Sequence, residues 1–172
     1  MRRLAISTLF WVLTLNMGCV PTGPINVAIH ALGEDEQTLD EEPPLPIEFG
    51  LQGGFHVFIR LALSNLIPGS SDRLEGIRDG NLPIARIAVG APDGLINAPY
   101  DQRIVLERAS GGWVSEPLLV VLQYYETPPT SGFEAELRQV EMEGFTVDFT
   151  VDVEDARGGQ GQVSAQARLD FP

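Results

Sequence analysis

The sequence contains no lysine and only one cysteine in 172 residues. Its 11 basic residues are all arginine, and 24 acidic residues give a net charge of −13. Such a chain has no basic stripe to neutralise phosphates, so we expect no nucleic-acid partner and no charge-driven attraction to anionic headgroups. A single cysteine excludes an internal disulfide, and one domain of this length can be held by its hydrophobic core instead.

Recognisable catalytic motifs are also absent. The sequence has no Gly-x-Ser-x-Gly elbow, no His-Glu-x-x-His zinc helix and no phosphate-binding loop. Gly159-Gln160-Gly161 lacks the third glycine and the following helix of a dinucleotide site. Hydrolases that use a pair of carboxylates leave little trace in a sequence, so an enzyme is not excluded on this ground.

The chain opens with positive charge followed by an uncharged apolar run. Arg2 and Arg3 precede LAISTLFWVLTL, the 12 residues from 4 to 15. A membrane-spanning helix needs roughly 20 apolar residues, whereas a run of this length suits the apolar region of an export signal. We therefore expect residues 1–18 to be a signal peptide; the alternative is a buried N-terminal element of the domain.

The lone cysteine, Cys19, follows Gly18 at the point where such a signal would be cut. The stretch resembles the lipobox of bacterial lipoproteins, in which the thiol accepts a lipid, although Asn16 and Met17 depart from the usual residues. We predict that Cys19 is lipidated and anchors the protein to the bacterial envelope, at the outer membrane. Ordinary secretory cleavage nearby, or a structural or catalytic cysteine, are the alternatives.

Residues 19–44 are expected to be a lipidated N-terminus followed by a possible edge strand and an acidic linker. Ile25, Val27 and Ile29 alternate with other residues as in a strand. GEDEQTLDEEPPLP, residues 33–46, then holds six acids, three prolines and no base, a composition typical of an extended loop or linker. A calcium loop is the alternative, but residues 34–42 lack its ligand spacing and its glycine turn.

Residues 45–172 show the period-two alternation of β-strands. Apolar residues occupy the odd positions of 55–63, and further strands are expected in LPIARIAVGA (82–91), QRIVLER (102–108) and PLLVVLQYY (117–125). The last of these is almost continuously apolar, so we expect it to be covered on both sides. About seven such strands indicate an all-β fold, an antiparallel β-sandwich of immunoglobulin-like kind.

The clearest pattern is C-terminal. Odd positions of 145–153 are apolar and even positions of 146–154 are Thr, Asp or Glu; after DARGGQGQ, odd positions of 163–171 are apolar again. This predicts a hairpin with one solvated face. Asp148, Asp152 and Glu154 are read as part of that face, with metal ligation as the alternative.

The segment from 131 to 143, SGFEAELRQVEME, fits two structures. Phe133, Ala135 and Leu137 have strand spacing, whereas Phe133, Leu137 and Val140 have helix spacing, with Ser131 and Glu134 as a possible capping box. Because every neighbouring segment reads as a strand, we predict a strand here too.

GLQGGFHVF, residues 50–58, resembles a stretch of uncharacterised predicted envelope lipoproteins of myxobacterial type, in which Gln-Gly-Gly-aromatic-His opens a strand. Residues 52–56 match that stretch, and VDVEDARGGQGQVSAQARL (151–169) is similar as a closing hairpin with Asp at the turn. The resemblance implies an envelope sandwich domain and supplies no activity.

Gly53 and Gly54 allow a bend with positive φ, and His56 should lie near Phe58. Even with His30, two imidazoles lack a third metal ligand, so we expect a structural role for His56 and no metal, cofactor or catalytic residue. The function expected is a non-catalytic envelope lipoprotein that binds or spaces surface components, its partner an unknown envelope protein or glycan. The alternative is a secreted or anchored glycan-active or hydrolytic domain that uses loop carboxylates.

Overall fold

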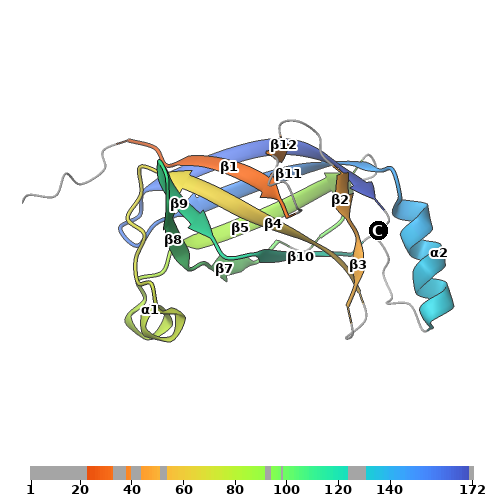
Figure 1. The fold of residues 1–172 in the computed structure, drawn as a ribbon, viewed down its shortest axis with the longest axis horizontal. Helices are drawn as coiled ribbons and strands as arrows, with labels where there is room; N and C mark the ends of the chain where they lie inside the picture. The colour runs from red at the N-terminus through yellow and green to blue at the C-terminus, as the bar shows by residue number, and fades with distance from the viewer. Residues whose placement is uncertain are drawn as a thin grey trace, which may run out of the picture.

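The computed structural model describes residues 23–32, 38–39, 44–50, 54–91, 94–97, 99–123 and 131–170. Strands predominate in these residues and form two six-stranded sheets, so the fold is mostly β, as predicted (Figure 1). The elements are β1 (Asn26–Ala31), β2 (Pro44–Pro46), β3 (Glu48–Phe49), β4 (Phe55–Ser64), α1 (Arg73–Asp79), β5 (Ile84–Ala91), β6 (Gly94–Leu95), β7 (Asp101–Arg103), β8 (Leu106–Ala109), β9 (Gly112–Ser115), β10 (Leu118–Leu122), α2 (Gly132–Met142), β11 (Thr146–Glu154) and β12 (Gln160–Asp170).

The first sheet is built around β4. One side of this strand pairs antiparallel with β1 and β3, and the other side pairs with β10 and β9; β8 extends the sheet beyond β9. Burial alternates along the whole of β4, with the five residues from Phe55 to Leu63 at odd positions all buried. The face predicted from the period-two pattern is therefore confirmed.

The second sheet has the order β2-β12-β11-β5-β6, with β7 also paired to β5. Its centre is the predicted C-terminal hairpin, in which Phe149 of β11 lies opposite Ala165 of β12. Phe149 is fully buried and Asp148 is exposed, so the two faces of β11 are as predicted. The neighbour of β12 on its other side, β2, runs parallel to it.

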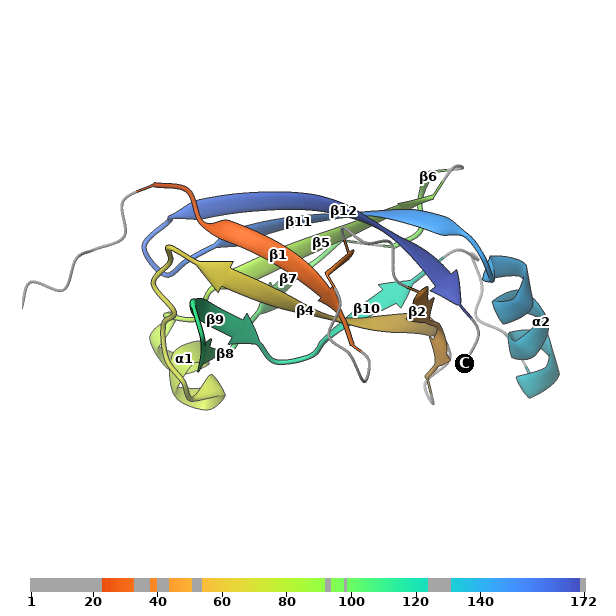
Figure 2. The ribbon, with the colours of Figure 1, turned by 45° about the horizontal axis from the view of Figure 1, so that its top comes forward.

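The two sheets pack face to face and come closest at one edge, where β1 lies beside β12 (Figures 1 and 2). There the backbone N–H of Ile25 donates to the carbonyl of Gln160 at 3.0 Å. A side chain at Gly161 would bring its Cβ within 2.3 Å of the Ile25 carbonyl oxygen, so only glycine allows this approach. Ile25, Ile29 and Leu39 are buried in the common core, which therefore draws on residues before position 45 as well.

The described residues contain twelve strands rather than about seven, partly because long extended segments are broken. β9 and β10 follow one another along the same side of β4, interrupted at Pro117, which has no N–H to donate. Beside the break, the N–H of Leu61 donates to Ser115 Oγ at 3.0 Å. The expectation that β10 is covered on both sides is wrong, because Leu119 is 37% exposed on the outer face.

Residues 132–142 form the helix α2, so the strand predicted for this segment is wrong. Ser131 caps the helix by accepting the N–H of Glu134 at its Oγ, which is one half of the capping box considered above. Ala135 and Met142 are buried against the sandwich. After the helix, Gly144 has a φ of 80° and donates its N–H to the carbonyl of Leu169 at 2.8 Å.

The short helix α1 lies between β4 and β5, where no helix was predicted from the sequence. Asp72 caps it by accepting the N–H of Glu75 at 2.8 Å, and Gly80 ends it with a φ of 67°. Both signals are present in the sequence, but the helix spans only residues 73–79, too few to show a clear apolar period.

The predictions for the signal peptide at 1–18, for Cys19, for Gln52 and Gly53, and for most of the acidic segment 33–43 lie outside the described residues. Within the described residues, neither helix has the length and apolar character needed to cross a bilayer.

Candidate functional site

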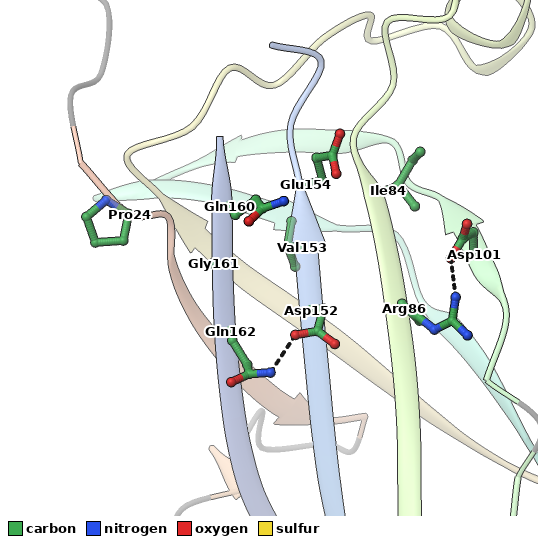
Figure 3. Close-up of a pocket in the computed structure, with 10 residues that line it drawn as sticks. All are labelled: Pro24, Ile84, Arg86, Asp101, Asp152, Val153, Glu154, Gln160, Gly161 and Gln162. Atoms are coloured by element: carbon green, nitrogen blue, oxygen red, sulfur yellow. Dashed lines mark hydrogen bonds and ion pairs between the residues drawn. The ribbon is translucent and has the colours of Figure 1, made fainter. Parts of the chain in front are cut away.

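A hollow of about 590 Å³ lies on the solvent-facing side of the second sheet, where the hairpin approaches its turn (Figure 3). It is open to solvent, and six of its ten lining residues carry charged or amide side chains. The charged and amide side chains around it come from four different strands and are Arg86, Asp101, Asp152, Glu154, Gln160 and Gln162.

Strand register places four of these residues in a row across the sheet. Asp152 of β11 lies opposite Gln162 of β12 and Arg86 of β5, and Arg86 lies opposite Asp101 of β7. Gln162 Nε2 donates to Asp152 Oδ1 at 2.6 Å, and an Arg86 guanidinium nitrogen lies 3.4 Å from Asp101 Oδ1 (Figure 3). We call Gln162, Asp152, Arg86 and Asp101 the polar row.

The same pairing continues along the outer face of the hairpin. Gln166 Nε2 donates to Asp148 Oδ1 at 2.7 Å, and the hydroxyls of Thr150 and Ser164 lie 3.3 Å apart. No group of three or more His, Cys, Asp and Glu residues in the described part of the chain could hold a metal ion. The carboxylates of Asp148 and Asp152 accept amide hydrogens from β12 instead.

Glu154 is the carboxylate of the hollow for which the described residues provide no hydrogen bond or ion pair. It lies two residues from Asp152 on the same face of β11, which separates their backbones by about 7 Å. Paired carboxylates in glycoside hydrolases are separated by roughly 5 to 10 Å. Both side chains are exposed, however, and nothing in the hollow shields them from solvent.

The structure places His56 on the outer face of β4, apart from this hollow. Its ring meets the Phe58 ring edge-on at 5.2 Å, and its Nε2 lies 3.6 Å from a Glu48 carboxylate oxygen. Gly54 has the predicted positive φ, of 132°. His30 lies opposite Arg60, four residues or about 13 Å along β4 from His56, so the structure does not bring the two histidines together.

Asp155, the Asp at the turn after β11, is a buried carboxylate to which reasoning from the sequence gave no role. It accepts backbone N–H groups from Ile67 at Oδ2, at 3.0 Å, and from Arg157 and Gly159 at Oδ1, both at 2.9 Å. Burial raises the pKa of Asp155, but these three donors and the charge of Arg157 outweigh it and hold the pKa below its usual value. The bond to Ile67 ties the hairpin to the chain that leaves β4, so Asp155 links the two sheets.

Comparison with models of known protein families finds no match, and no curated protein matches the sequence.

Proposed function

We propose that this chain is an envelope protein, anchored through a lipid on Cys19, whose sandwich binds surface components without transforming them. The polar row carries the proposal. Hydrogen bonds hold its exposed carboxylate, amide and guanidinium groups in place across four strands. An ordered array of donors and acceptors matches the hydroxyls of a glycan, and it does so at a small cost in side-chain ordering.

Three further parts of the proposal come from the sequence. They are export by residues 1–18, kinship with the predicted envelope lipoproteins of myxobacterial type, and an immunoglobulin-like arrangement of the two sheets. The face-to-face sheets and the closing hairpin support the last of these, whereas the parallel β2–β12 pair departs from the purely antiparallel pairing predicted from the sequence.

Co-sedimentation with insoluble envelope polysaccharide tests whether the polar row binds glycan. Asp152→Asn removes a charge from the polar row, and we expect it to weaken binding about tenfold, as loss of one good charged hydrogen bond does. Asp148→Asn is the matched control, because it changes the same residue type on the same strand outside the hollow. Equal binding by all three proteins, or binding by none, would contradict the proposal.

A hydrolytic role is the second candidate, favoured by the Asp152–Glu154 spacing. If the protein releases reducing sugar from the same polysaccharide and Glu154→Gln abolishes this release, the function is hydrolysis rather than binding.

The anchor is tested separately through Cys19→Ser. Wild-type protein grown with an alkyne-tagged fatty acid should carry the label and fractionate with membranes, because two or three acyl chains anchor a protein stably. The variant should lose both properties. Equal labelling of the two proteins would rule out lipidation at Cys19.

A further inference from the structure

Helix α2 carries a second apolar stripe that the sandwich does not cover. Phe133, Leu137 and Val140 are 71%, 51% and 55% exposed. At about 100° per residue these three positions fall within about 60° of one another, on the side of the helix opposite the buried Ala135 and Met142. Single exposed apolar residues are ordinary, but three large ones aligned on one helix face form a continuous patch.

Glutamates border this stripe on both sides. Glu134 and Glu141 fall on one side of it around the helix axis, and Glu136 falls on the other. Arg138 is the one basic residue in the sequence of α2, and it forms an ion pair with Glu134. The exposed face is therefore apolar along its centre and acidic along its edges.

The helix is held at both ends, so the stripe is presented in a fixed orientation. Ser131 caps its first turn, Met142 is fully buried near its end, and the Gly144 N–H is bonded to the end of β12. A preordered helix loses little conformational entropy when it binds.

We propose that the stripe of Phe133, Leu137 and Val140 docks into an apolar groove with a basic rim on a partner protein. Spacing at i, i+4 and i+7 is the pattern by which an amphipathic helix fills such a groove, and the bordering glutamates select basic residues around it. A second copy of this chain would set glutamates against glutamates. Helices that bind anionic bilayers carry Lys and Arg beside the apolar face, whereas this one carries acids.

The helix lies at the end of the sandwich opposite to the one at which β1 begins (Figures 1 and 2). If Cys19 is anchored as proposed, α2 points away from the membrane, towards other components of the envelope. This orientation rests on the proposed anchoring, but the docking itself does not.

Site-specific photo-crosslinking in the source cells tests the docking with the full-length chain. A photoreactive phenylalanine analogue replaces Leu137 in one protein and Leu74, the 80% exposed apolar residue of α1, in the control. We expect a protein adduct from position 137 alone. The crosslinked protein is then purified and used as the probe in binding titrations. The chain without either substitution, Phe133→Ser and Leu74→Ser are compared, all three carrying Cys19→Ser. Because none of them can be lipidated at Cys19, the result does not depend on the proposed anchor.

Phe133→Ser should raise the Kd at least tenfold, Leu74→Ser should leave it unchanged, and added salt should weaken binding because the rim contacts are ionic. Both variants alter exposed side chains and should melt with the wild type. A homodimeric adduct, a lipid adduct, no adduct at 137, or binding that ignores Phe133→Ser would each overturn the proposal.

Discussion

The β11–β12 hairpin and helix α2 are both amphipathic, but they place their apolar side chains differently. Along β11, every second residue from Val147 to Val153 enters the core and the intervening polar residues face solvent. In α2, Ala135 and Met142 are buried on one side while Phe133 and Leu137 are exposed on the other. The apolar side chains of the hairpin are thus used to build the core, whereas three of the five apolar side chains of α2 are exposed to solvent.

This difference bears on stability and on recognition. Burial of an aromatic side chain contributes to the free energy of unfolding roughly in proportion to the area removed from water, whereas an exposed one contributes little. The solvent-facing stripe of α2 therefore has no evident role in holding the domain together, which is the reason to look for its role in binding.

The largest effect is expected from removing a phenylalanine ring in each region. Phe149→Ala should lower the free energy of unfolding by about 3–5 kcal/mol, because a fully buried ring is replaced by a cavity. Phe133→Ala in α2 should change it by less than about 0.5 kcal/mol. Urea unfolding of both variants measures the difference. Similar losses at the two positions would show that the exposed stripe is covered in solution.

The next effect concerns Asp155, whose hydrogen bond to Ile67 links the hairpin to the first sheet. In Asp155→Asn, Oδ1 can still accept from Arg157 and Gly159, but the new amide nitrogen faces the N–H of Ile67 and cannot accept from it. We expect a loss of roughly 1–3 kcal/mol at pH 7, the usual cost of an unpaired buried donor.

The pH dependence of the free energy of unfolding tests the hydrogen bonds of Asp155 a second time. Because the folded pKa of Asp155 is lowered, its carboxylate stabilises the fold above the unfolded value of about 3.9, and this stabilisation is lost as pH falls through the folded pKa. Wild-type stability should therefore decline more steeply than that of Asp155→Asn below about pH 4. Parallel curves would show that the carboxylate is not held as the structure indicates.

A smaller effect is expected at the start of α2. Ser131→Ala removes the oxygen that accepts the Glu134 N–H and should cost about 1 kcal/mol, whereas Ser131→Asn should keep most of the stability because Asn also caps helices well. Thermal unfolding followed by circular dichroism compares the three proteins. If alanine and asparagine behave alike, the cap does not hold the helix.

The contrast between the two regions also explains which parts of the fold could be predicted from the sequence. The hairpin follows a single two-residue alternation of apolar and polar residues, has glycines next to both strands and places a polar residue at each outward position. Its local pattern and its final structure therefore agree. Residues 131–143 satisfied both a strand and a helix pattern, and the neighbouring strands favoured the wrong choice. The Ser131 cap and the burial of Ala135 and Met142 decide for the helix, and burial is set by tertiary contacts.

The candidate site shows the same limit. Each outward position of β11 could be predicted as polar, but the polar row depends on strand register. Register places Arg86 beside Asp152 and Asp101 beside Arg86, although these residues are far apart along the chain. The role of Asp155 could not be predicted for a related reason, because its hydrogen-bond partner Ile67 is 88 residues away along the chain. The Asp-x-x-x-Gly spacing of the turn, in which Gly159 donates back to Asp155, is the one local signal that points to it.

The smallest effect is expected next to the largest, at Asp148. Its side chain faces solvent and accepts one exposed hydrogen bond from Gln166, so Asp148→Ala should change the free energy of unfolding by no more than about 0.5 kcal/mol. Adjacent strand residues point to opposite faces of the sheet. The difference between this value and the loss at Phe149 therefore tests directly which face each residue occupies. Unfolding in calcium and in chelator adds a second comparison. Stabilisation of the wild type by calcium that disappears in Asp148→Ala would mean that the acids of the outer face bind a cation, and the hairpin would then contribute a binding site as well as the core.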